Sequence, residues 1–344
     1  MTPPPGSLGR IGAVFVARNR EFFRDRATLA WSVLLPLVIV FGFAFAFSGG
    51  APERYTIGVL GEPAAAERAL GLDFVDYTAV AERTAGVRKV RRHQLDLLVD
   101  FDARRYWVSD ASPAGQLLER ALRGSADTGG ADTGPAFARA SVPGRVIRYV
   151  DWLVPGLLAM NMMFTALFGV GFVIVRYRKN GVLKRLKATP LRPWEFLVAQ
   201  LGSRLLIIVA ITVAIFVGSH AVLAFPVHGH AGWLLLILLL GGICLIALGL
   251  IVAARTASEE LAGGLLNLFT WPMMFLSGVW FSTEGLHPGL QSAARALPLT
   301  HIIEAARAVM IDGAGFARIA PNLAVLALLA GGFLAIGAHL FRWE

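Results

Sequence analysis

The chain has 344 residues, of which 56% are hydrophobic, and its mean hydropathy is +0.62. A soluble core of that length would not bury so much apolar surface, so the composition indicates a polytopic membrane protein. The formal charge of +9 comes from bases that cluster beside apolar runs, where they set topology and meet anionic headgroups, and this argues against nucleic acid as a partner.

The amino-terminal residues 1–27 are expected to form a cytoplasmic tail and an interfacial helix. Apolar residues recur there at helical spacing among several arginines, at Leu8, Ile11, Val14, Phe15, Phe22 and Phe23. Residues 28–47 are uncharged and match the ~20 residues that cross a bilayer, so they form the predicted first span. A secretory signal is the alternative, because residues 44–46 resemble a cleavage site, but the apolar core of such signals is only ~7–15 residues long.

Residues 48–148 form the only long hydrophilic region, and we expect a small external α/β domain there. The pattern predicts strands at 55–60, 73–77, 95–101 and 106–110 and helices at 64–71 and 116–124. Long domains are translocated largely regardless of charge, so the many arginines are compatible with an external position. Residues 124–134 are predicted to be a flexible linker, whose near-repeat of ADTG favours low complexity over a calcium loop.

Five more apolar stretches complete a prediction of six transmembrane helices. The second span lies within 149–175, and residues 201–344 hold the rest, at 205–225, 233–254, 261–281 and 319–341. The loop 226–232 has no lysine or arginine and suits the outside, whereas Arg255 and the arginine-rich amino end suit the inside. Both termini are therefore predicted to be cytoplasmic.

A basic elbow at 176–200 separates the second and third spans. It contains many lysines and arginines but a single acidic residue, Glu195, and a short loop of this composition stays on the cytoplasmic side. The elbow predicts a short amphipathic helix. Its apolar side carries Val182, Leu183 and Leu186, and its basic side carries Lys184, Arg185 and Lys187. Residues 189–190 should end that helix, and Pro193 should begin the next, with Glu195 near its positive end.

The region 282–318, between the last two spans, is too apolar for an ordinary loop and too interrupted by glycine and proline to cross the membrane. We expect two short re-entrant or interfacial helices there, at about 288–296 and 300–310. Irregular backbone at membrane depth is tolerated only where protein or water covers it, so this region is predicted to form a cavity mouth on the outer side.

Polar residues inside predicted spans mark two helices. Asn161 and Thr165 lie on one face of the second span, and Asn267 and Thr270 lie on one face of the fifth. Such side chains usually join helices across a bundle, and they also suit substrate contact or a dimer axis. The aromatic residues of the same helices could line an apolar route, although they suit packing or lipid contact equally well: Phe164, Phe168, Trp271 and Phe275.

Several kinds of chemistry have no motif in this sequence. The chain has no G-x-x-x-x-G-K-[ST], so an energy source must come from a partner, and it has no G-x-S-x-G or H-E-x-x-H. His220, His228 and His230 lack carboxylates or cysteines around them and are interpreted as solvated histidines. The single cysteine, Cys244, lies in an apolar run and excludes an intrachain disulfide. We predict no catalytic residue and no metal site.

Two stretches resemble the permease subunit of a type-2 ABC transporter. The elbow is similar to the family pattern G-x-L-x-R-L-x-A-T-P-x-x-x-W-E, with its letters at Gly181, Leu183, Arg185, Leu186, Ala188, Thr189, Pro190, Trp194 and Glu195. The sequence FLSGVWF at 275–281, followed by LPLTH at 297–301 and by 304–307, resembles the second family signature. The family often has proline after the two aromatic residues, where this chain has Ser282 and Thr283.

The resemblance implies the function of a transport subunit. It implies that residues 182–188 form a coupling helix that docks on a separate ABC ATPase, with ATP and Mg bound by that partner and no cofactor in this chain. The layout resembles the branch that exports drugs, lipids or other amphipaths across the bacterial inner membrane, with a second permease copy or a similar permease as a further partner. The alternative is a membrane-anchored sensor or envelope assembly factor without transport.

Overall fold

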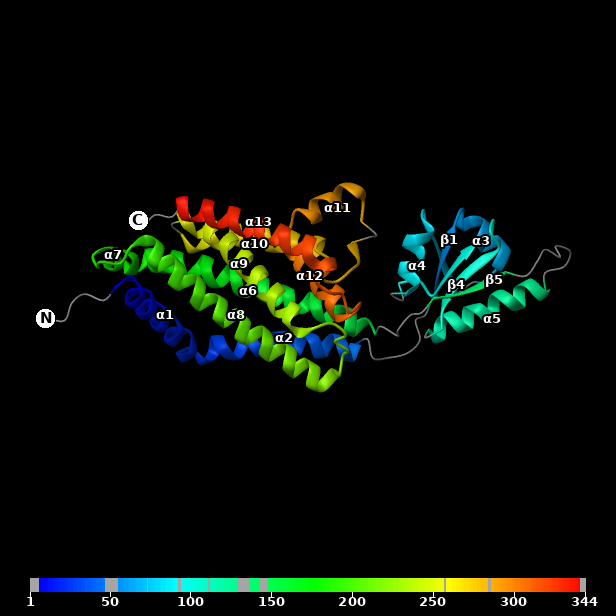
Figure 1. Ribbon diagram of the computed structural model, residues 1–344, viewed down its shortest axis with the longest axis horizontal. Coiled ribbons are helices and arrows are strands. Elements are labelled where there is room, and N and C mark those ends of the chain that lie inside the picture. The colour runs from blue at the N-terminus through cyan, green and yellow to red at the C-terminus, as the bar shows by residue number, and fades with distance from the viewer. Residues whose placement is uncertain are drawn as a thin grey trace. The chain divides into compact units, whose positions relative to one another are not determined.

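The structure is a computed structural model, and its chain divides into two compact units (Figure 1). One unit joins Met1–Phe47 to Tyr149–Glu344, and the other is Ser48–Arg148. The residues that the structure describes are 6–46, 55–72, 74–91, 94–110, 112–128, 137–142, 148–256, 258–283 and 286–340.

The first unit is helical. Its elements are α1 (Ser7–Arg24), α2 (Arg26–Ala46), α6 (Tyr149–Lys179), α7 (Val182–Lys187), α8 (Pro193–Leu223), α9 (Ala231–Arg255), α10 (Glu259–Leu276), α11 (Pro288–Arg295), α12 (Pro298–Met310) and α13 (Phe316–Leu340). The amino end of α1 and the carboxyl end of α13 both lie at the end of the unit that carries α7 (Figure 1). Helices α11 and α12 lie at the opposite end (Figure 1).

Among the described residues, four helices are long and apolar enough to cross a membrane, namely α6, α8, α9 and α13. They correspond to the predicted second, third, fourth and sixth spans. A fifth is added if α1 and α2, which are bent by 62° at their junction, form one broken span. The predicted fifth span corresponds to α10, whose hydropathy is lowered by Glu259 and Glu260 in its first turn. The count of six spans therefore stays a prediction.

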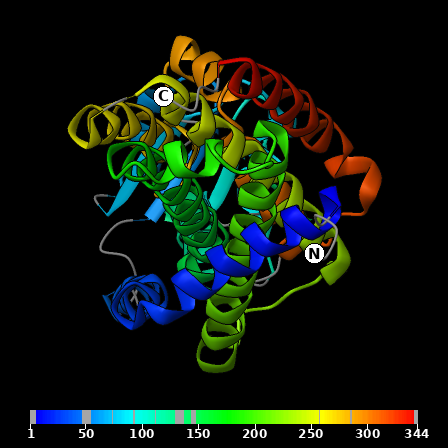
Figure 2. The same ribbon diagram turned by 90° about the vertical axis from the view of Figure 1, so that its left-hand side faces the viewer.

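Helix α1 is the amphipathic helix expected at the amino end. It packs along α8, with Val14 and Phe22 against the core and Leu8 and Phe23 exposed. It runs obliquely to the bundle in Figure 2, which looks onto the end where α7 lies. This geometry fits a helix that lies on a membrane surface while one side contacts protein.

Helix α6 forms the centre of the helical unit. It contacts α2, α8, α9, α10 and α12, and most of its residues are buried. Small residues let backbones approach closely: a Cβ at Gly249 of α9 would lie 3.2 Å from the Leu167 backbone, and one at Gly156 would lie 2.8 Å from the Val279 carbonyl oxygen. Such contacts are typical of helix packing in membranes.

The two short helices expected between the last spans are confirmed as α11 and α12. Helix α12 is largely buried and packs on α6, α9 and α13, whereas α11 has a single buried residue, Ala294. The chain there bends back between α10 and α13 without crossing the unit (Figure 1). Their re-entrant placement in a membrane stays a prediction.

The second unit is a small α/β unit. Its elements are β1 (Tyr55–Leu60), α3 (Pro63–Leu70), β2 (Val75–Ala79), α4 (Arg83–Arg91), β3 (Leu97–Asp100), β4 (Arg105–Ser109), α5 (Pro113–Thr128) and β5 (Ala138–Val142). The five-stranded sheet has the order β2-β1-β3-β4-β5. Only the β3–β4 pair is antiparallel among the pairs described. One face is covered with side chains of α3 and α5, and the other with Val90 of α4.

The strand and helix predictions for this unit are largely confirmed, with two additions. Helix α4 and strand β5 were not expected, because α4 is rich in arginine and β5 is short and mostly exposed. The predicted linker begins later than expected, because α5 continues to Thr128. The remaining residues of that linker, 129–134, lie outside the described residues.

Candidate functional site

The elbow between α6 and α8 has the predicted order of helix, break and helix. Helix α7 turns its apolar side to the bundle, where Leu183 is fully buried and Leu186 is half-buried against the core. The basic side is exposed at Lys184, Arg185 and Lys187. Gly181 precedes α7 with a φ of +67°, a left-handed conformation that glycine adopts without steric cost.

The break after α7 is closed by local hydrogen bonds. The Thr189 hydroxyl donates to the Leu186 carbonyl at 2.6 Å. Pro193 occupies the first turn of α8, and the Glu195 carboxylate accepts from the backbone N–H of Arg192 at 2.9 Å. This reciprocal cap fixes the start of α8, as the sequence predicted.

Glu195 also forms a buried ion pair that the sequence did not reveal. Its side chain is fully buried, and Arg10 of α1 donates to it from Nε at 3.0 Å and from Nη2 at 2.6 Å. Paired Arg–carboxylate contacts of this kind fix geometry as well as charge. The ion pair attaches α1 to the elbow.

Arg178 of the elbow caps the end of α9. Its Nη1 donates to the carbonyls of Ala253, at 3.0 Å, and of Thr256, and its Nη2 donates to the Ala254 carbonyl at 2.9 Å. The last carbonyls of a helix lack intrahelical partners and carry partial negative charge. Arg178 therefore has a structural role, because it joins the end of α6, just before α7, to the end of α9.

A second polar cluster lies at the amino-terminal end of α6. Arg307 of α12 donates from Nε to the Trp152 carbonyl at 3.1 Å, and its guanidinium lies 3.5 Å from the centre of the Trp152 ring. Its Nη2 lies 3.5 Å from the Val279 carbonyl oxygen. The Tyr149 hydroxyl donates to the Trp280 carbonyl at 3.2 Å. The second signature thus packs on the start of α6.

The LPLTH segment links the neighbouring helices. The Thr300 hydroxyl donates to the Ala294 carbonyl at 2.6 Å. The His301 ring lies between Asn322 Oδ1, at 3.0 Å, and the Arg295 carbonyl oxygen, at 2.8 Å. These contacts hold α11 and α13 to α12.

The polar and aromatic candidates of the second span line one cavity. Asn161, Phe164, Thr165 and Phe168 of α6 border a cavity of about 590 Å³, together with side chains of α2 and Arg204 of α8. Phe164 and Phe168 stack with ring centres 5.8 Å apart. Helical spacing predicted a shared face for Asn161 and Thr165 alone, and no sequence pattern pointed to Arg204.

The candidates of the fifth span lie elsewhere. Asn267, Trp271 and Phe275 are exposed on α10, and Trp271 and Phe275 stack at 6.0 Å. Thr270 is buried, with its hydroxyl 3.4 Å from the Asn267 carbonyl oxygen. The structure does not bring the α6 and α10 sets into one cavity.

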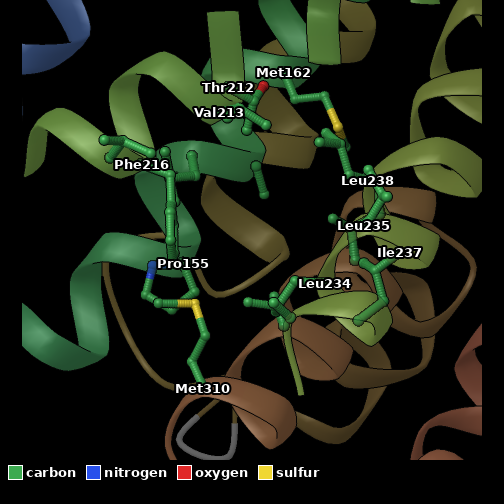
Figure 3. A pocket seen from close by; sticks show the side chains of 16 residues that line it. Pro155, Met162, Thr212, Val213, Phe216, Leu234, Leu235, Ile237, Leu238 and Met310 are labelled. Atoms are coloured by element: carbon green, nitrogen blue, oxygen red, sulfur yellow. The ribbon is translucent and has the colours of Figure 1, made fainter. Parts of the chain in front are cut away.

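A second cavity, of about 300 Å³, lies between α6, α8, α9 and α12 (Figure 3). Its lining is almost wholly apolar, with Pro155 and Met310 at one side and Met162 at another (Figure 3). The Thr212 hydroxyl lines it and has no hydrogen-bond partner among the described residues. No local sequence pattern indicated this cavity, because its walls come from distant helices.

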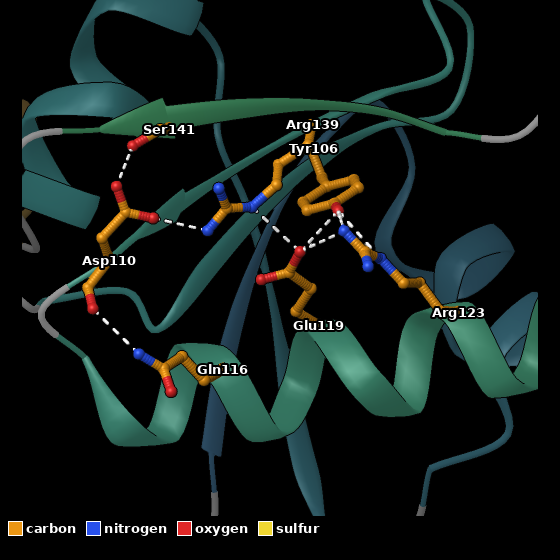
Figure 4. A network of polar contacts seen from close by, with 7 residues as sticks. All are labelled: Tyr106, Asp110, Gln116, Glu119, Arg123, Arg139 and Ser141. Carbon is orange, nitrogen blue, oxygen red and sulfur yellow. Dashed lines mark hydrogen bonds and ion pairs between the residues drawn. The ribbon is translucent and has the colours of Figure 1, made fainter.

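The α/β unit carries a network of charged side chains (Figure 4). Glu119 of α5 accepts from Arg123 at 2.6 Å, from Arg139 at 2.9 Å and from the Tyr106 hydroxyl at 2.8 Å. Arg139 also pairs with Asp110, which accepts from the Ser141 hydroxyl. These hydrogen bonds lower the pKa of Asp110, the Ser141 bond most, and burial raises the pKa of Tyr106. The charges pair with one another, which suits a structural role.

The three histidines interpreted as solvated have separate partners. His230 caps α9 by accepting from the Gly232 N–H at 3.0 Å, and His228 Nδ1 lies 3.1 Å from the Met310 carbonyl oxygen. His220 stacks on Phe216. Within the described part of the chain, no three His, Cys, Asp or Glu side chains come together as a metal site would require.

The sequence model of the ABC-2 type transporter family matches residues 118–311, which is more than half of the 344 residues. The chain belongs to this family. The resemblance seen in the two signatures is thereby confirmed.

Relatives of this ABC-2 chain include two permeases and one nodulation protein. It is 25% identical to the inner membrane transport permease YhhJ of Escherichia coli over 54% of this chain and 51% of YhhJ. It is 28% identical to Nodulation protein J of Sinorhizobium fredii, over 59% of this chain and 79% of that protein. It is 22% identical to the probable multidrug ABC transporter permease YbhR of Escherichia coli, over 48% of this chain and 45% of YbhR. The chain thus spans about half the length of the two Escherichia coli relatives.

The matched region of this ABC-2 chain contains both stretches that resemble the family signatures. It runs from α5 through the elbow to the end of α12. The signature residues are therefore those that shape the two ends of α6, while Arg10 and the walls contributed by α2 lie outside the match.

Proposed function

We propose that this chain is the transmembrane permease subunit of an ATP-driven ABC exporter, with α7 as its coupling helix. The observation that carries the proposal is the geometry of α7. Its apolar side is buried in its own bundle, while Lys184, Arg185 and Lys187 are exposed. An exposed rigid element that is tied to α1, α6 and α9 suits the transfer of a partner's movement into the membrane helices.

The partner in this proposal is a separate ABC ATPase that binds ATP and Mg. Residues Val182, Ala188 and the basic side of α7 would contact it, and ATP binding would move α7. In the proposed topology, the chain crosses a bacterial inner membrane six times. Both termini are cytoplasmic, and the α/β unit lies outside. The ends of α1 and α13 at the α7 end support this arrangement (Figure 1).

A second permease, identical or similar, would complete the pathway. Trp271 and Phe275 are 52% and 55% exposed on α10, beside the exposed Asn267. A polar residue among exposed aromatic rings on a membrane helix suits contact with another protein helix better than contact with lipid alone. The proposed substrates are drugs, lipids or other amphipaths, and the similarity to YbhR, a probable multidrug permease, supports the drug class.

The test is co-purification from the native membrane in mild detergent, with identification of stoichiometric partners and assay of ATP hydrolysis. Leu183→Asp and Leu186→Asp would disturb the bundle because these side chains pack inward, so charge reversal at Lys184→Glu and Arg185→Glu is the sharper probe. Arg295→Glu, at the exposed end of α11, is the matched control.

The proposal requires an ABC ATPase that is retained by wild type and Arg295→Glu and is lost from the α7 variants. Recovery of the intact chain with no ATPase would contradict it. That result would favour the membrane-anchored sensor or assembly factor, with the α/β unit binding an envelope partner.

A further inference from the structure

Arg204 is a charged side chain within an apolar helix. It lies on α8, and it donates from Nε to the Thr165 carbonyl at 2.8 Å and also from Nη2 to the same oxygen. The guanidinium lies on Gly169 of α6, where an added Cβ would be 1.4 Å from Nη2. Glycine at 169 therefore creates the space in which this charge lies.

No carboxylate pairs with Arg204 among the residues that the structure describes. The neighbouring aromatic ring, that of Phe22, has its centre 5.9 Å away, and one backbone carbonyl uses only part of the five donors of a guanidinium. An ionisable residue at membrane depth is costly, and it commonly marks a functional site. The positive charge is thus available to an anion.

A second donor borders the same space. Asn161 lies one helical turn before Thr165, and its Nδ2 atom is buried without a hydrogen-bond partner in the described structure. A buried amide without a partner loses its bonds to water and gains nothing in exchange. The rest of the lining is mostly apolar or aromatic, with Trp31 and Leu35 of α2 facing Phe164 and Phe168 of α6.

We propose that this cavity binds an amphipath that carries one anionic group. Arg204 and Asn161 donate to the anionic oxygens, and the aromatic walls hold the apolar body. The cavity volume of about 590 Å³ is in the range of pockets that bind small molecules. The smaller cavity of Figure 3 offers no charge and so no means of selecting an anion.

The same chemistry has two sources, a transported amphipath and an anionic phospholipid of the bilayer. The cavity reaches the junction of α1 and α2, where Phe22 and Ala27 border it. The binding deepens the proposed function, on which its role in transport rests. The binding itself needs no ATPase, and failure of transport would leave it measurable.

The experiment measures adducts by native mass spectrometry of the purified full chain in a neutral detergent. The probes are dodecyl phosphate and, as a cation with the same alkyl chain, dodecyltrimethylammonium. A charged hydrogen-bonded contact contributes roughly 1.5–3 kcal/mol, so wild type should prefer the phosphate by about 10-fold to 140-fold. Arg204→Gln should abolish the preference, and Arg204→Lys should retain part of it because its charge remains without the planar fork.

Gly169→Ala provides a test that keeps the arginine. The added Cβ displaces the guanidinium from α6, so the preference for dodecyl phosphate should fall while the net charge stays constant. Arg295→Gln is the control for removal of one exposed positive charge and should bind as wild type does. If Arg204→Gln does not fold, the wild-type preference and Gly169→Ala decide the question.

Equal binding of the two probes by wild type would overturn the proposal, and so would an unchanged preference in folded Arg204→Gln. A second series with phosphatidylglycerol and phosphatidylcholine of equal acyl chains distinguishes the sources. Retention of phosphatidylglycerol with exclusion of dodecyl phosphate supports a bound phospholipid. Binding of dodecyl phosphate in competition with phosphatidylglycerol supports a transported amphipath.

Discussion

The helical unit and the α/β unit use charged side chains in different ways. In the helical unit, Arg178 and Arg307 each join helices by bonding to backbone carbonyls, and Glu195 has one arginine partner. In the α/β unit, the exposed Asp110 shares its partner Arg139 with the more buried Glu119. A lost partner in the helical unit leaves a buried polar group unsatisfied, whereas water can replace a lost partner of the exposed Asp110. Equal substitutions should therefore have unequal effects.

The largest effect is expected from placing a charge on the buried side of α7. Leu183→Asp removes a fully buried side chain and introduces a carboxylate without a partner, which should cost about 4 kcal/mol or more of unfolding free energy. Denaturant titration in mixed micelles measures it. Arg185→Asp, on the exposed side of the same helix, should stay within about 0.5 kcal/mol of wild type. Similar losses in both would show that α7 has no buried side.

The elbow illustrates what sequence could and could not predict. The periodicity of residues 182–187 and the prolines gave the helix, the break and the next helix, because these signals are local. The partner of Glu195 was missed, because Arg10 lies far away in the chain and no pattern pairs the two. Arg178 looked like one more topological base until its contacts with α9 were known.

The cavity beside α6 also shows that local signals are predictable from sequence and that contacts between distant residues are not. Helical spacing placed Asn161 and Thr165 on one face, and the structure gathers them around one cavity with Phe164 and Phe168, whose place the sequence left open. Arg204 escaped notice because its role depends on Gly169 of another helix. In the α/β unit, β5 was missed because a short, exposed edge strand lacks the apolar alternation that marks a strand.

The next largest effect is expected at the amino-terminal end of α6. Arg307→Met removes the bond to the Trp152 carbonyl and the contact with the Trp152 ring, so the unfolding free energy should fall by about 2–3 kcal/mol. The measurement is the same titration, with Arg318→Met as control because Arg318 pairs with Asp312 at an exposed position. An equal, small loss in both variants would remove the contrast between buried and exposed arginines.

A smaller effect is expected where backbones approach. In Gly156→Ala the new Cβ would lie 2.8 Å from the Val279 carbonyl oxygen, so the helices must separate, at a cost of about 1–3 kcal/mol. Gly264→Ala on α10 meets open space and should stabilise by about 0.5–1 kcal/mol through helix propensity. Thermal unfolding in detergent compares the pair, and a stabilised Gly156→Ala would contradict the close contact.

The smallest effect should come from Asp110, and it depends on pH. Its pKa is lowered by the Ser141 hydroxyl and by Arg139, so the folded state holds the proton less tightly than the unfolded chain does. The stabilisation is therefore present above the ordinary aspartate pKa of ~3.9 and is lost as the pH falls below that value. Hydrogen exchange of β5 in the full chain measures this, by comparison with Asp110→Asn at each pH.

The comparison with Asp110→Asn decides whether that network acts locally. Wild type should protect the β5 amides better than Asp110→Asn at neutral pH, and the difference should vanish in acid as Asp110 takes up a proton. A difference that persists in acid would assign the effect to packing. Because Arg139 keeps its second partner, Glu119, the loss should stay confined to the edge strand, unlike the losses at the ends of α6.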